Sequence, residues 1–76
     1  PPPAGVPADS LITAKVKTAL LREKNLDSFD VSVETYRNEV LLSGFVKDET
    51  QRAKAVQVAS NVNGVERVKD GLAVRK

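Results

Sequence analysis

The stretch from Phe29 to Val46, FDVSVETYRNEVLLSGFV, decides the fold. Apolar and polar residues alternate over 29–34, and a second apolar run covers 40–46. Alternation with a period of two predicts half-buried strands, because successive side chains of a strand point to opposite faces. Between the runs, Tyr36-Arg37-Asn38-Glu39 predicts a hairpin turn, since asparagine tolerates the left-handed backbone conformation that tight turns need. The stretch therefore predicts two strands joined as a hairpin.

The second strand is predicted to lie at the centre of a sheet. The run Val40-Leu41-Leu42 is apolar at consecutive positions, which is typical of a well-covered strand. Gly44 has the same parity as Leu42 and Val46, so it belongs to the same side of the strand. A glycine inside a strand usually marks a close backbone approach or a β-bulge. We therefore expect either a helix backbone packed against Gly44 or a bulge at this position.

A helix is predicted before the hairpin. Asp9 and Ser10 are residue types that cap helix N-termini, and apolar periodicity follows them at once. We expect the helix to begin at Asp9 or Ser10 and to fade near Asn25, with Leu26 closing the core. Its buried face would consist of Ile12, Val16, Ala19 and Leu20, which fall on one side of a helix.

A second helix is predicted after the hairpin. Asp48 is an N-cap type, and Gln51 follows it at the spacing of a capping box. Gly64 is well placed as a structural glycine that ends this helix at position C′. The expected buried face consists of Ala55, Val58, Ala59 and Val62.

Residues 65–74 predict a third strand, interrupted at Asp70-Gly71. Val68, Leu72 and Val74 share one parity, so one side of the strand stays inward. The element order is then helix, strand, strand, helix, strand, which predicts a small α+β domain. Two helices can cover one face of a three-stranded sheet, and we expect the other face to be solvated. That face would carry Ser32, Glu34, Leu41, Ser43, Phe45, Lys69, Ala73 and Arg75.

The N-terminal residues differ in composition from the rest. The segment Pro1–Pro7, PPPAGVP, holds all four prolines, and proline favours an extended backbone. We therefore expect residues 1–8 to be a disordered, proline-rich linker and residues 9–76 to be one domain. The chain contains no methionine, so we expect that a signal peptide or a further domain has been removed upstream. No apolar run approaches the roughly 18 residues of a membrane span.

Missing residue types exclude most enzyme chemistry. The chain has no cysteine, histidine, tryptophan or methionine, which excludes disulfides, thiol nucleophiles, histidine acid/base pairs and the usual zinc sites. The close acid pairs are Asp27/Asp30, in a polar connection, and Asp48/Glu49, at a helix start where acids suit the dipole. We therefore expect no catalytic residues, no bound metal and no cofactor.

Nucleic-acid binding is also not expected. The formal net charge is only +2, and three aromatic residues offer little surface for base stacking. The glycines are too far apart for the G-x-x-G loop of a KH domain.

The first helix carries an excess of positive charge. Between Ser10 and Leu26 there are four bases and one acid, Glu23. At 100° per residue two bases flank each side of the buried stripe, and Leu21 lies nearly opposite it. Two interpretations remain open: a surface that binds anionic lipid, and a solvated helix whose lysines lie along the core. The candidate surface residues are Lys15, Lys17, Leu21, Arg22 and Lys24.

Several spaced motifs together resemble the BON domain family. They are Val31-x-Val33, Val40-x-Leu42-x-Gly44-x-Val46, Ala55-x-x-x-Ala59, Gly64-Val65-x-x-Val68 and Leu72-x-Val74, preceded by a similar opening helix at Ile12-Thr13-Ala14-Lys15-Val16.

The resemblance implies an αββαβ sandwich with a mixed sheet and no catalytic residues. It implies a periplasmic or outer-membrane-associated protein of Gram-negative bacteria, connected with osmotic stress and able to bind phospholipid. The expected partners are therefore an anionic phospholipid surface or envelope proteins, and not nucleic acid. The alternative function is a protein-interaction module of an envelope complex, in which Leu41 and Phe45 on the open face recruit the partner.

Overall fold

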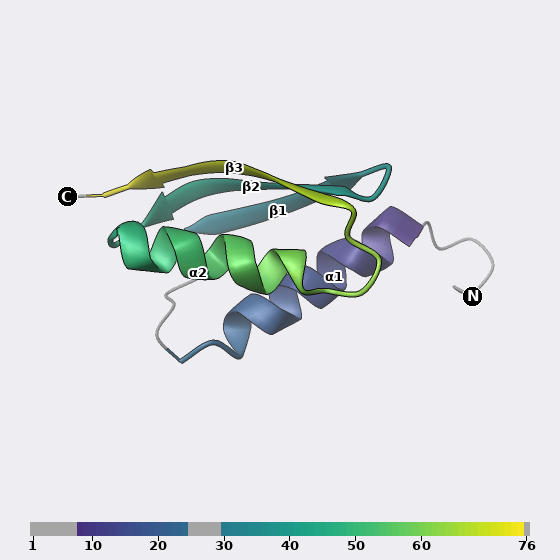
Figure 1. Ribbon diagram of the computed structural model, residues 1–76, viewed down its shortest axis with the longest axis horizontal. Coiled ribbons are helices and arrows are strands. Elements are labelled where there is room, and N and C mark those ends of the chain that lie inside the picture. Colours follow the sequence, from purple (N-terminus) through teal and green to yellow (C-terminus); the bar gives the residue numbers. More distant parts are fainter. Residues whose placement is uncertain (1–7, 25–29, 76) are drawn as a thin grey trace.

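The computed structural model describes residues 8–24 and 30–75, which form one sheet covered by two helices (Figure 1). The predicted element order and α+β class are confirmed. The elements are α1 (Ala8–Leu21), β1 (Val31–Tyr36), β2 (Glu39–Val46), α2 (Glu49–Ser60) and β3 (Arg67–Val74).

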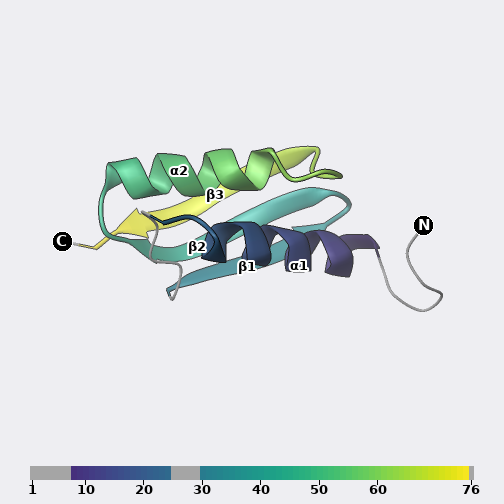
Figure 2. The ribbon, with the colours of Figure 1, turned by 90° about the horizontal axis from the view of Figure 1, so that it is seen from below.

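The sheet has the order β1-β2-β3, so β2 is central, as its apolar run predicted. β1 pairs with β2 in antiparallel register, and β3 pairs with β2 in parallel register. A parallel partner requires a crossover connection, and α2 provides it. Figure 2 shows α1 and α2 side by side over the same face of the sheet, with α1 on the β1 side and α2 on the β3 side.

The turn of the hairpin is held by the first helix. Arg37 and Asn38 have φ values of +50° and +67°, the pattern of a two-residue type I′ turn. The Asp9 carboxylate accepts hydrogen bonds from the backbone N–H groups of Arg37 (2.9 Å) and Asn38 (3.1 Å). The prediction that Asp9 or Ser10 opens the helix is therefore wrong, because α1 already includes Ala8 and Asp9 binds the turn instead.

The core lies between the helices and the inward side of the sheet. The buried stripe of α1 and the alternating residues of β2 meet there as predicted, and Ala55 and Ala59 let α2 approach closely. Residues buried in this core are Ile12, Val16, Leu20, Val33, Val40, Leu42, Val46, Ala55, Ala59 and Leu72.

Both predicted helix ends need correction. α1 ends at Leu21 rather than near Asn25, and the last turn closes with a tighter bond from the Glu23 N–H to the Leu20 carbonyl (3.2 Å). α2 ends at Ser60, and Asn61 is its C-cap, so Gly64 is not the C′ residue. The predicted proline-rich linker, apart from Ala8, and the interpretations that rested on Leu26, Asp27 and Phe29 fall outside the described residues.

The start of α2 was predicted correctly. The Asp48 carboxylate accepts the Gln51 N–H at 2.8 Å, and the Gln51 side-chain oxygen accepts the Lys47 N–H at 2.9 Å. The Asp48 bond satisfies one of the backbone donors that the helix itself leaves unpaired, whereas the Gln51 side chain binds Lys47, one residue before the N-cap.

Gly44 matches neither predicted role. Its φ is +114°. Val31 of β1 pairs with Gly44 of β2 in an unbroken one-to-one register, so there is no bulge at this position. A Cβ at Gly44 would overlap the carbonyl oxygen of Asp30, which accepts the Phe45 N–H at 3.1 Å. The close approach is therefore to the start of the neighbouring strand and not to a helix.

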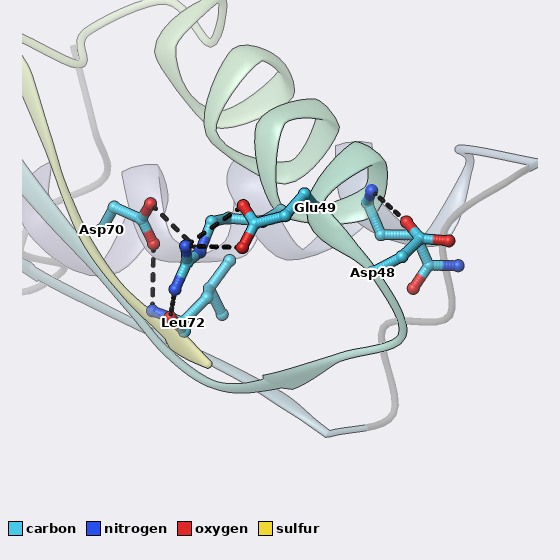
Figure 3. A network of polar contacts seen from close by, with 6 residues as sticks. Asp48, Glu49, Asp70 and Leu72 are labelled. Atoms are coloured by element: carbon cyan, nitrogen blue, oxygen red, sulfur yellow. Dashed lines mark hydrogen bonds and ion pairs between the residues drawn. The ribbon is translucent and has the colours of Figure 1, made fainter. Parts of the chain in front are cut away.

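β3 is continuous through Asp70-Gly71, so the predicted interruption is wrong. Figure 3 shows the reason: the Leu72 N–H donates to the Asp70 carboxylate (3.0 Å), and the Arg52 guanidinium donates to the Leu72 carbonyl (2.6 Å). The Arg75 N–H donates to the Val46 carbonyl of β2. Because successive backbone N–H groups of a strand point to opposite sides, the N–H and carbonyl groups of Leu72 face away from β2. The network therefore occupies the outer edge of β3, and Glu49 adds an ion pair to Arg52 at 3.0 Å.

The glycine geometry yields a stability prediction. Gly44→Ala should lower the free energy of unfolding by about 3 kcal/mol or more, because a side chain at positive φ meets fixed backbone there. Gly64→Ala is the matched control: its φ is +101°, but the new Cβ would only touch the Ile12 side chain at 3.4 Å. We expect it to cost about 1–2 kcal/mol. Urea unfolding measures both, and equal losses would contradict this account of Gly44.

The β3 edge yields a second prediction. Asp70→Ala removes the acceptor of the Leu72 N–H and one carboxylate beside Arg52, so we expect a loss of about 1–2 kcal/mol. Glu66→Ala, which removes an exposed hydrogen bond to Asn38, should cost less than about 0.5 kcal/mol. Urea unfolding again compares the two. An Asp70→Ala protein as stable as the unsubstituted one would show that this edge network contributes nothing.

Candidate functional site

The outer side of α1 carries the basic residues that the sequence singled out. Lys15, Lys17, Leu21, Arg22 and Lys24 are all exposed, and we call them the basic face of α1. The Leu21 side chain is 74% exposed, as expected from its position opposite the buried stripe. The helix packs Ile12, Val16 and Leu20 inward, which leaves this face to solvent.

The acids of the same segment point elsewhere. Asp9 binds the hairpin turn, and the Glu23 carboxylate lies 3.6 Å from the Lys54 ammonium on α2. None of the four bases of the basic face forms an ion pair with another described residue. The tertiary structure therefore separates the charges of this segment, with the acids held against the protein and the bases directed to solvent.

Two shallow hollows flank the basic face of α1. Lys15 and Arg22 line one of about 370 Å³, whose floor is made of small and apolar side chains from the same helix. Lys17 and Leu21 line another of about 140 Å³, where α1 meets Val31 and Val33 of β1. Helical spacing predicts Lys15 and Arg22 on one side of the buried stripe and Lys17 and Lys24 on the other. Lys15 and Arg22 line one hollow together, whereas Lys24 lines neither.

The predicted partner face lies on the opposite side of the sheet. Leu41 is half-buried, and Phe45 is 46% exposed, with the Arg75 guanidinium 4.7 Å above its ring. Tyr36, at 70% exposure, shares this face and was missed by the sequence reasoning. Its parity with Ser32 and Glu34 was the signal that would have found it.

The two structural glycines have different roles in the fold. Gly44 allows the backbone of β2 to pass the start of β1, and Gly64 turns the chain between α2 and β3 beside Ile12. Neither side of the molecule gathers a metal-binding cluster: within residues 8–24 and 30–75, no group of acidic side chains is close enough to hold a metal ion. No helix in the same ranges has the length and apolar character to cross a membrane.

Comparison with known proteins places this arrangement in a family. The BON domain family matches residues 8–76. The chain belongs to the BON domain family. It is also similar to osmotically-inducible protein Y of Escherichia coli (strain K12), with 52% identity over 67 residues. That match covers 88% of this chain and 33% of the relative, so the chain spans about a third of the relative's length.

In this BON domain the spaced motifs and the basic face are structurally distinct. The apolar residues of the motifs pack toward the core, and Gly44 meets backbone. The motifs therefore explain the fold, whereas the exposed bases of α1 need a separate explanation.

Proposed function

We propose that this BON domain is a non-enzymatic binding module of the bacterial cell envelope, and that it associates with anionic phospholipid through the basic face of α1. The observation that supports this most is the charge separation on α1. Four bases without described ion-pair partners surround an exposed leucine, while Asp9 and Glu23 are turned toward the protein. Such a face is suited to lying on a lipid headgroup layer.

The expected free energies of binding make this a weak and reversible association. Each base near an anionic surface contributes about 1 kcal/mol, and inserting one leucine contributes about 1.5–3 kcal/mol. The combined effect corresponds to a dissociation constant on the order of 0.1 mM. A longer protein or a second copy would raise the apparent affinity by holding two such faces near one surface.

The similarity to an osmotically inducible protein supports the cellular setting of the proposal. The relative's name connects that protein with osmotic stress. We extend this to a role in envelope or osmotic stress, in the periplasm or at the outer membrane. An anionic phospholipid surface there is the partner that the basic face of α1 fits best.

Charge reversal tests the proposed surface. The 76-residue chain should co-sediment with vesicles of phosphatidylglycerol at low salt, and not with vesicles of phosphatidylcholine. Lys17→Glu combined with Lys24→Glu should weaken binding at least about tenfold, because two attractive charges become repulsive. Lys47→Glu makes the same type of change at an exposed residue after β2 and should leave binding within about twofold. Absence of vesicle binding, or equal binding by all three proteins, would overturn the proposal.

Leu21 tests whether the helix also inserts an apolar group. Leu21→Ser keeps the charges and removes the exposed side chain, so we expect a roughly fivefold or greater loss of binding. The loss should persist at high salt, where the contribution of the bases is screened. Vesicle titration at two salt concentrations measures it. Unchanged binding would restrict the interaction to surface charge alone.

A further inference from the structure

The face of the sheet that points away from both helices is uncovered by any described element (Figure 1). The outward side chains of β1, β2 and β3 form this surface, which we call the open face. The strand registers arrange it in rows that run across all three strands. One row is Glu34 of β1, Leu41 of β2 and Lys69 of β3, since Glu34 pairs with Leu41 and Leu41 with Lys69.

Most charges of the open face are paired within the chain. The Arg67 guanidinium lies 3.6 Å from the Glu39 carboxylate, and that of Arg75 lies 3.1 Å from Asp30. Glu34 and Lys69 are exposed and form no ion pair with any residue in 8–24 or 30–75. These two opposite charges lie at the two ends of one row, with the half-buried Leu41 between them.

We propose that the open face binds the same face of a second copy of this chain, around a two-fold axis that runs along β2. Rotation by 180° about this axis exchanges the β1 side with the β3 side and keeps each row at its own level. Glu34 of each copy then faces Lys69 of the other, and Leu41 faces Leu41. Two levels along, beyond the row of Ser43, Phe45 faces Phe45. The row of Glu34, Leu41 and Lys69 is therefore self-complementary in charge and in apolar contact. Glu39 also meets its own copy on the axis, and its charge is already paired with Arg67 of the same chain.

The charges also disfavour a second two-fold arrangement of the same faces. An axis parallel to the sheet, perpendicular to the strands and level with this row would keep β1 opposite β1 and the row opposite itself. Like charges would then face each other, Glu34 against Glu34 and Lys69 against Lys69, which disfavours binding. In the proposed arrangement the strands of the two sheets lie nearly aligned about 10 Å apart, the usual geometry of face-to-face sheets. A glutamate and a lysine side chain together span that distance.

The size of the face sets the strength of the dimer. It is three strands wide and at most eight residues long, or roughly 15 by 25 Å. This is smaller than the roughly 800 Å² per partner of a standard interface. We therefore expect a monomer–dimer equilibrium in the micromolar to millimolar range. The basic face of α1 lies in the helix layer on the other side and stays uncovered, so this inference is independent of phospholipid binding (Figure 2).

Charge swapping over the open face tests the proposal on the whole 76-residue chain. In sedimentation equilibrium from about 10 μM to about 1 mM, the average mass of the unsubstituted chain should rise from 8.2 kDa toward twice that value. Glu34→Lys or Lys69→Glu alone should raise the dissociation constant at least about tenfold, because each creates two like-charge contacts. The double variant Glu34→Lys/Lys69→Glu restores opposite charges at both contacts and should return to within about threefold of the unsubstituted chain. Gln57→Glu, at an exposed residue of α2 in the helix layer on the other side of the sheet, should have no effect.

Two further measurements locate the interface. Leu41→Asp places a charge on the two-fold axis against its own copy, and it should abolish the dimer while circular dichroism shows an intact fold. In a mixture of isotope-labelled and unlabelled chains, NMR should detect contacts between the Leu41 methyl groups of different copies. A chain that stays at 8.2 kDa up to about 1 mM would overturn the proposal and leave the open face to another protein. A dimer that is insensitive to Leu41→Asp, or a double variant that does not recover, would overturn it as well.

Discussion

The two-sided pairing of β2 is the constraint on which the rest of this structure depends. β2 binds β1 in antiparallel and β3 in parallel register, and its Val40 and Leu42 side chains are fully buried. The antiparallel partner requires a tight turn with two positive φ values, and Asp9 of α1 binds both N–H groups of that turn. The parallel partner requires a crossover, which is α2, and Arg52 of that helix binds the far edge of β3. Each helix is thus tied to one of the two pairings.

This arrangement leaves two surfaces of different character. Both helices are used to cover the inward side of the sheet, so the outer side of α1 and the open face of the sheet remain available for binding. The acids near α1 form contacts within the fold, such as the Glu23–Lys54 ion pair, and the bases remain exposed to solvent. The small net charge of +2 therefore conceals a locally basic surface. Within the described residues, no group of acidic side chains is close enough to hold a metal ion.

Periodicity predicted the elements well, because it reports which side of each element is buried. The stripe of Ile12, Val16 and Leu20 and the alternation through Val40 and Leu42 were recognisable from spacing alone. Predictions failed where a side chain binds a backbone group far along the chain. Asp9 resembled a cap, but its partners lie 28 and 29 residues away. Asp70-Gly71 resembled an interruption, but Arg52, 20 residues before Leu72, supports the strand there.

The sequence by itself determined the order of the elements, their buried sides, the cap at Asp48 and the membership of the basic face of α1. These follow from local spacing and residue type, which act within one or two turns of the chain. Only the tertiary structure decided how the acids and bases are separated, why Gly44 must be glycine, and which strand edge is blocked. It also decided that Glu34 and Lys69 lie at the two ends of one row. These features depend on contacts between distant residues and on the register of the parallel pair β2–β3, which, unlike the register of the hairpin, is not set by a local turn.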